Sequence, residues 1–138
     1  ELDLRGNAIS AVRGDALSVL TALETLDLSE NAVEALPPVL AALPALTCIR
    51  VGNNSLSSLE WLDASRCGSG SLGRLATIEA PSNKITCVPE RLVALPSLRR
   101  LDLFGNLLAS LPPGLALISS LEDLGVGCNY LTNVPTEL

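Results

Sequence analysis

Histidine is absent from the 138 residues, and this absence removes several kinds of chemistry. Without an imidazole the chain cannot form a Ser–His–Asp or Cys–His nucleophile, or a histidine general base. The sequence also lacks any CxxC pair, and zinc sites built from four cysteines normally use such close pairs. We therefore expect no catalytic residue, no metal site and no small-molecule substrate, so that the chain is not an enzyme by itself.

Cysteine is scarce and widely spread. The four cysteines are Cys48, Cys67, Cys87 and Cys128. The favoured interpretation is four reduced thiols in a cytoplasmic protein, and two disulfides in a secreted protein are the alternative.

Aromatic residues, basic residues and long apolar runs are also few. Trp, Tyr and Phe occur once each, so we expect an aliphatic core. Nine basic against 15 acidic residues give a net charge of −6, which excludes an electrostatic basis for nucleic-acid binding. Polar or turn residues interrupt every apolar run, so no membrane-spanning segment is expected.

A glycine-rich stretch at 68–73 matches the GxGxxG pattern of dinucleotide sites. Such a site requires the motif between a strand and a helix, with an acidic residue downstream. Here the motif lies inside a Ser/Gly-rich insertion, so we interpret it as a loop and expect no cofactor.

The dominant feature that is present is one repeated pattern. It is centred on six asparagines: Asn7, Asn31, Asn54, Asn83, Asn106 and Asn129. Their spacings are 24, 23, 29, 23 and 23 residues. Apolar residues keep fixed offsets of five and three before, and two and five after, each Asn. The shared pattern is LxxLxLxxNxLxxLPxxLxxLxx, and internal periods of this length are typical of solenoid proteins.

This pattern resembles the leucine-rich repeat family over essentially the whole chain. The resemblance implies an α/β solenoid, or horseshoe, with short parallel strands on its concave face and short helical turns on its convex face. We expect one domain over 1–138, with repeats at 1–22 (partial), 23–45, 46–74, 75–97, 98–120 and 121–138 (partial). Neither end shows a cap with a polar outer face, so we expect the array to be a segment of a longer protein.

Residue chemistry explains each part of the repeat. The LxL portion alternates with period two, which predicts strands near 2–4, 25–28, 48–51, 77–80, 100–103 and 123–126. After each strand the chain turns inward, where an Asn amide supplies two donors and one acceptor. We expect the six asparagines to form a buried ladder, each bonding its own turn and the next repeat. Pro after the last apolar position predicts short helical turns near 38–43, 90–95 and 113–118, of α or 3₁₀ type.

Two repeats depart from the pattern. The first replaces LP with AVRGDALSVL (11–20), closer to a 24-residue variant. The third carries LEWLDASRCGSGSLGR (59–74) and is six residues longer than its neighbours. Residues 57–60 fit a capping box, so we expect a short helix through Trp61 and Leu62, then a loop.

Any function must come from residues that face outward from the strands. The candidates for partner binding are Phe104, Arg100, Arg99, Asp102, Glu79, Arg50 and Asp27. The charged ones can instead neutralise one another across strands, Arg50 with Asp27 and Glu79, and Arg100 with Asp123. Phe104 can be an anchor for a partner, or it can fold back over its own repeat.

The family resemblance implies a protein-interaction module that binds a partner protein on its concave sheet. The LPxxL form is similar to intracellular scaffold and signalling proteins of the Ras-suppressor and Scribble type. One alternative is the recognition arm of a larger enzyme, such as a kinase, a Roco-type GTPase or a ubiquitin ligase. Another is an extracellular receptor ectodomain, which would require cysteine-rich caps.

Overall fold

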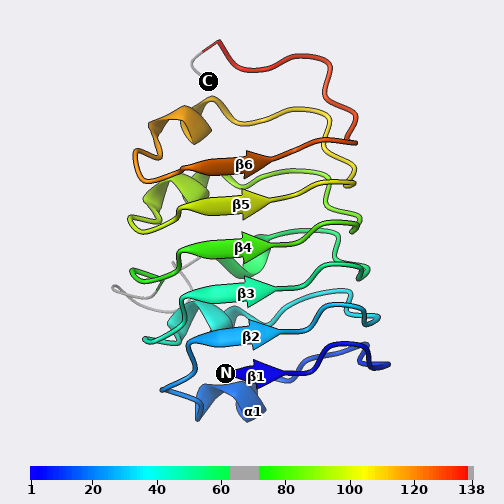
Figure 1. Ribbon diagram of the computed structural model, residues 1–138, viewed down its shortest axis with the longest axis vertical. Helices are drawn as coiled ribbons and strands as arrows, with labels where there is room; N and C mark the ends of the chain where they lie inside the picture. The colour runs from blue at the N-terminus through cyan, green and yellow to red at the C-terminus, as the bar shows by residue number, and fades with distance from the viewer. Residues whose placement is uncertain (63–71, 137–138) are drawn as a thin grey trace.

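Six short parallel strands stack in chain order to form one side of the protein. The structure is a computed structural model that describes residues 1–62 and 72–136. The strands are β1 (Leu2–Asp3), β2 (Thr25–Asp27), β3 (Cys48–Arg50), β4 (Thr77–Glu79), β5 (Arg100–Asp102) and β6 (Asp123–Gly125). Each pairs only with its sequence neighbours, in the order β1-β2-β3-β4-β5-β6 (Figure 1). The six predicted strand positions are confirmed, and each strand ends one residue earlier than predicted.

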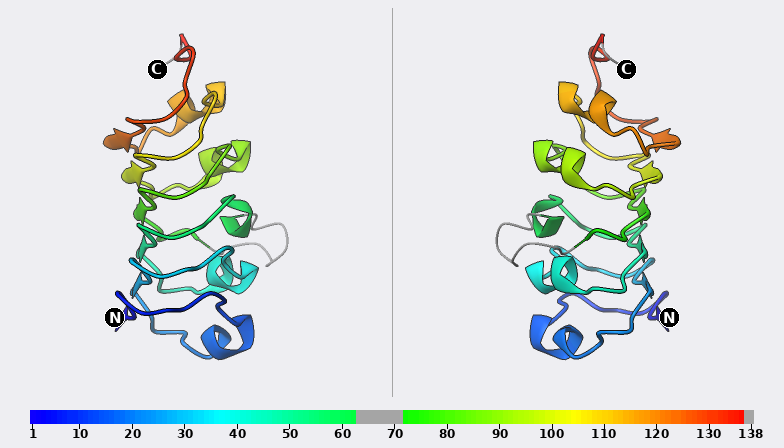
Figure 2. Two further views of the ribbon diagram at one scale, coloured as in Figure 1. Left: turned by 90° about the vertical axis from the view of Figure 1, so that its right-hand side faces the viewer. Right: turned by 90° about the vertical axis from the view of Figure 1, so that its left-hand side faces the viewer.

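Short helical turns form the opposite side. They are α1 (Gly14–Ser18), η1 (Pro38–Ala42), η2 (Glu60–Leu62), η4 (Glu90–Ala94) and η5 (Pro113–Leu117). Seen from the side, the strands follow the concave edge and the helical turns lie across from them (Figure 2). This arrangement confirms the predicted fold class.

The type of helix differs between the first repeat and the later ones. Helices η1, η4 and η5 are 3₁₀ helices of five residues, and each follows an extended proline, Pro37, Pro89 or Pro112. The tighter i→i+3 pattern suits such short pieces. The first repeat lacks this proline and forms the single α-helical turn of the described residues, α1. The expected short helix through Trp61 and Leu62 is confirmed as η2, whereas most of the predicted loop, with Cys67 and the glycine-rich motif up to residue 71, lies outside the described residues.

The core is a stack of aliphatic side chains between the two sides. Register places Leu26, Ile49, Ile78 and Leu101 next to one another on successive strands, and all four are fully buried. Trp61, at 3% exposed, is the one aromatic residue in the described core. Burying each Leu or Ile stabilises the fold by about 1.5–3 kcal/mol, and neighbouring repeats supply the burial.

The repeated asparagines bond their own turn and the preceding repeat. Asn106 Nδ2 donates to the carbonyls of Leu103 (3.0 Å) and Phe104 (3.4 Å) in its own turn. It also donates to the Ala80 carbonyl of the preceding repeat (3.0 Å), and its Oδ1 accepts the Ile85 N–H (3.0 Å). The partner across repeats is therefore the preceding one, where the sequence had suggested the next.

The same set of bonds recurs at the other asparagines with a preceding repeat. Those residues are Asn31, Asn54, Asn83 and Asn129. Asn7 bonds only the carbonyls of Leu4 and Arg5 in its own turn. Burial follows the same trend, because Asn83 and Asn106 are buried whereas Asn7 is exposed.

A left-handed residue stands immediately before each of these asparagines. The six residues are Gly6, Glu30, Asn53, Ser82, Gly105 and Cys128, with φ between 53° and 70°. Three of them are Gly or Asn, the types that tolerate positive φ best, whereas Glu, Ser and Cys carry a steric cost there. In the sequence, this left-handed turn was indicated only by Gly6, Asn53 and Gly105, each directly before a repeated asparagine.

Replacing Glu30 by glycine is expected to raise the free energy of unfolding by about 1 kcal/mol, because glycine adopts this backbone without the Cβ clash. Urea denaturation of Glu30→Gly and the parent chain would measure the change. Glu34→Gly is the control, because Glu34 is also exposed but has no positive φ, and it should lower stability. Equal effects of the two substitutions would contradict the strain at Glu30.

Candidate binding surface on the outer face of the sheet

Side-chain alternation places twelve residues on the outer face of the sheet. Leu26 and Leu28 point into the core and are fully buried, so Asp27 between them points outward. The same positions of all six repeats define the strand face: Glu1, Asp3, Thr25, Asp27, Cys48, Arg50, Thr77, Glu79, Arg100, Asp102, Asp123 and Gly125.

Three aspartates of the strand face bond the backbone just beyond their own strand. Oδ1 of Asp3, Asp27 and Asp102 accepts the N–H two residues on, at 3.0, 2.9 and 3.0 Å. The donors belong to Arg5, Ser29 and Phe104. These carboxylates thus satisfy a backbone donor where the chain leaves the sheet. The carboxylates of Asp27 and Asp102 therefore have a structural role at the end of their strands.

Glu79 lacks that role because the residue two positions on is Pro81, which has no N–H. Its carboxylate instead joins two arginines from the flanking strands. Glu79 Oε2 accepts from Arg50 Nε at 3.0 Å, and Oε1 accepts from Arg100 Nε at 3.1 Å. Arg100 also pairs with Asp123 and lies 3.7 Å from an Asp102 oxygen. Four candidate residues, Arg50, Glu79, Arg100 and Asp102, therefore form one network.

This network neutralises most of the charge at the middle and C-terminal strands. The side chains of Arg50 and Arg100 are 40% and 45% exposed, so each such pair contributes about 0–1 kcal/mol. Arg99 immediately precedes β5 in the chain and pairs with Glu122, at the end of that strand away from Phe104. The structure therefore does not bring Arg99 and Phe104 together.

Phe104 lies where β5 leaves the sheet, and its ring turns toward the next repeat. A Cβ built on Gly127 would lie 3.1 Å from Phe104 Cδ2, so the ring rests against this glycine. Pro81 lies against a glycine too, Gly52, but in the preceding repeat. Phe104 as a whole still has 48% of its surface exposed. It is therefore held in place by Gly127 and open to a partner on its other side.

Asp27 differs from the other candidates because it is only 6% exposed. The expected pairing of Arg50 with Asp27 is not among the ion pairs of the described residues, since Arg50 turns to Glu79. Asp27 Oδ1 accepts the Ser29 N–H, and no described residue donates a hydrogen bond to Oδ2. Asp27 is therefore a nearly buried carboxylate with one free oxygen.

Cys48 lies among these charged groups. Burial raises the pKa of its thiol, and the carboxylates of Glu79, Asp27 and Glu1 act in the same direction, against the opposing effect of Arg50. The thiol therefore stays protonated at neutral pH.

Two exposed apolar side chains in the last two repeats were not predicted. Leu107 and Tyr130 each follow a repeated asparagine, and they are 41% and 68% exposed. The equivalent residues of earlier repeats are Ala8, Ala32, Ser55 and Lys84. Aligning this position would have shown that only the last two repeats carry large apolar side chains there.

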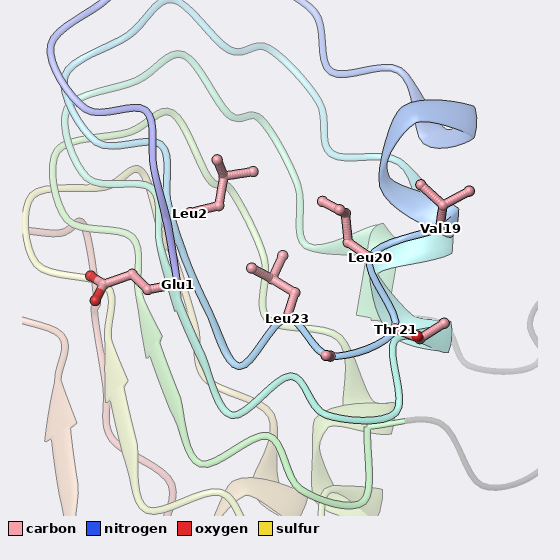
Figure 3. A pocket seen from close by; sticks show the side chains of 7 residues that line it. Glu1, Leu2, Val19, Leu20, Thr21 and Leu23 are labelled. Carbon is pink, nitrogen blue, oxygen red and sulfur yellow. The ribbon is translucent and has the colours of Figure 1, made fainter.

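A cavity of about 390 Å³ opens at the N-terminal end of the stack (Figure 3). Its wall is mainly apolar, with Leu2, Leu20 and Leu23 directed into the space between β1 and α1, whereas the Glu1 side chain points away. It is the open end of the aliphatic core, and Glu1 and Thr21 are the polar residues that line it.

Neither a membrane span nor a metal cluster is found in the described ranges. Within 1–62 and 72–136, no helix has the length and hydropathy needed to span a bilayer. The same ranges contain no group of three or more Cys, Asp or Glu side chains placed to hold a metal ion.

Comparison with known proteins gives a consistent picture of the repeats. A family model described as leucine rich repeat matches residues 1–56. The chain is 36% identical over 116 residues to opticin of Mus musculus and 34% identical over 114 residues to Tsukushi of Gallus gallus. These matches cover 84% and 80% of the chain but only 26% and 30% of the relatives. An adenylate cyclase of Podospora anserina is 31% identical over 97% of the chain, which spans 6% of that enzyme.

Solved structures share the fold. An internalin C2 of Listeria monocytogenes superposes with a TM-score of 0.80 at 23% identity, over 96% of this chain and 54% of the internalin. The plant peptide hormone receptor RGFR1, in complex with RGF2, gives a TM-score of 0.68 at 23% identity, over 83% of this chain and 18% of the receptor. At these identities the likeness concerns the fold alone.

Proposed function

We propose that this chain, which belongs to the leucine-rich repeat family, is a protein-binding module that engages a partner protein on its concave strand face. Its role is that of a scaffold or signalling protein without catalytic activity of its own. The fold presents a continuous row of outward side chains on a rigid sheet, and binding through such surfaces is common for leucine-rich repeat domains.

The observation that carries this proposal is Phe104 beside a fixed network of charges. Phe104 is half exposed and its ring is backed by Gly127, and the neighbouring Asp102 belongs to the network of Arg50, Glu79 and Arg100. Aromatic side chains that need little reordering are the usual anchors of protein interfaces. The paired charges around it provide specificity more than affinity.

Phe104→Ala is expected to weaken binding of the protein partner by about 2 kcal/mol, because the anchor's contact area is lost. Its stability should fall by less than about 1 kcal/mol, since half of the residue is already exposed to water. The partner is first captured from extract on the immobilised chain, and its affinity is then measured by titration. Leu117→Ala is the control, because Leu117 is 77% exposed on η5 at the opposite side. Loss of binding with Leu117→Ala and not with Phe104→Ala would place the interface on the convex side.

The cytoplasm is the proposed location. The described thiols of Cys48, Cys87 and Cys128 are all free, as expected in a reducing compartment. The similarity to opticin and Tsukushi gives this compartment no support, so the proposal rests on the thiols alone.

A second candidate is the recognition arm of a larger enzyme. Nearly the whole chain matches a small part of the Podospora anserina adenylate cyclase, as a repeat region within a multidomain enzyme would. In that case Phe104→Ala in the full-length protein would slow turnover of a protein substrate while leaving turnover of a small model substrate unchanged. Equal slowing of both would exclude this role.

A further inference from the structure

We propose that the N-terminal half of the strand face binds a cationic side chain, Arg or Lys, of a basic protein segment, with the Asp27 carboxylate as its central acceptor. This inference deepens the proposed function and rests on it, because it names the chemistry of the partner at the same surface.

The distribution of charge on the strand face is the first step. The face carries six carboxylates, Glu1, Asp3, Asp27, Glu79, Asp102 and Asp123, against two arginines, Arg50 and Arg100. It therefore holds four of the six net negative charges of the chain. Arg50 lies on β3 and Arg100 lies on β5, and the two bind carboxylates of β4 to β6. At β1 and β2 the carboxylates of Glu1, Asp3 and Asp27 face one nearby cation, Arg5, which lies 3.8 Å from Asp3, so an excess of negative charge remains there.

Asp27 provides the second, independent step. A carboxylate that is 6% exposed keeps little of its hydration, and its Oδ2 accepts no hydrogen bond from a described residue. Oδ2 is not among the fully buried polar atoms that lack a partner, so it keeps contact with solvent on the outer face. A charged acceptor with so little hydration forms strong hydrogen bonds to a charged donor. The nearest candidate partner, Arg50, is held by Glu79 at 3.0 Å. A cation supplied from outside would satisfy this oxygen.

The geometry of the surface favours a protein segment over a metal ion or a small molecule. No group of three or more Cys, Asp or Glu side chains placed to hold a metal ion exists within the described ranges, and Asp27 does not line the N-terminal cavity. The acids are instead spread along an open sheet whose strands are about 4.8 Å apart. Asp3 lies beside Asp27 in the register of β1 and β2, and its side chain is 52% exposed, with Oδ2 3.8 Å from Nη2 of the similarly exposed Arg5. An extended basic segment can cross such a row and contact both carboxylates.

The test uses two fluorescein-labelled peptides of equal length, one of alternating Arg and Ser and one of alternating Glu and Ser. Fluorescence anisotropy measures their affinity for the whole chain at low and at physiological salt. We expect the Arg/Ser peptide to bind, with affinity falling as salt rises, and the Glu/Ser peptide not to bind. Binding of the Glu/Ser peptide at comparable affinity would overturn the inference.

Asp27→Asn is the decisive variant, because an amide oxygen can still accept the Ser29 N–H while the charge is removed. We expect it to weaken binding of the Arg/Ser peptide by about tenfold. Glu90→Gln on η4 removes one charge from the opposite side and should change the affinity by less than about twofold. Equal losses in the two variants would mean attraction by net charge only and would overturn the inference.

Two further measurements separate folding and function from this result. Asp3→Asn alters an exposed residue, so it tests the same surface if Asp27→Asn fails to fold, and we expect about a threefold loss. If Asp27→Asn has no effect while Phe104→Ala still loses the captured partner, only the basic-segment inference fails. If no strand-face variant affects either the peptide or the captured protein, the proposed function fails as well.

Discussion

Leu101→Ala is expected to lower the free energy of unfolding by about 2–5 kcal/mol, because it opens a cavity in the middle of the aliphatic stack. Leu101 is fully buried, and the register places it between Ile78 and Leu124 of the flanking strands. The neighbouring repeats are held by their own bonds across the sheet and cannot fully close around the missing atoms. Urea denaturation followed by circular dichroism measures the change.

Leu124→Ala is the matched control for that substitution. It occupies the same position of the last strand but is only partly buried, so its loss should be clearly smaller. In the Leu101→Ala variant, hydrogen exchange should also show local opening of β5 and β6 before β2 and β3, since each repeat is stabilised by its neighbours. Equal losses at the two positions would contradict the account of a core that is densest in the central repeats.

Asn106→Ala is expected to cost about 1–3 kcal/mol of stability, because it leaves buried backbone groups unpaired. The side chain donates to Ala80 and Leu103 at 3.0 Å and accepts from Ile85 at 3.0 Å, and Asn106 is 3% exposed. No water can replace these bonds without entering the turn. Thermal and urea denaturation of the purified variant would test the prediction.

The comparison with Asn7→Ala sharpens this test. Asn7 bonds only its own turn and is exposed, so its removal leaves groups that water can reach. We expect a small effect, below about 0.5 kcal/mol. A melting temperature unchanged by both substitutions would mean that the bonds between repeats contribute nothing net to stability.

The sequence alone determined the fold and the positions of the repeated residues. A period kept in six copies specifies which residues become neighbours, so the strand order and the register of Leu26, Ile49, Ile78 and Leu101 followed directly from the spacing. The row of outward charges was also visible, because a strand alternates its two faces residue by residue. Positions that repeat are therefore predictable without coordinates.

Only the tertiary structure decided which hydrogen-bond or ion-pair partner each outward side chain takes. Spacing allowed Arg50 to pair with Asp27 or Glu79, and the structure selects Glu79, which is free because Pro81 offers it no N–H to accept. Asp27 instead bonds Ser29 and is left nearly buried, with one oxygen open to the concave side. The pattern also did not determine the left-handed backbone of the residue before each Asn, or the contact of the Phe104 ring with Gly127. The repeat determines which groups are neighbours, whereas competition for each donor and acceptor depends on distances and rotamers that exist only once the chain is packed.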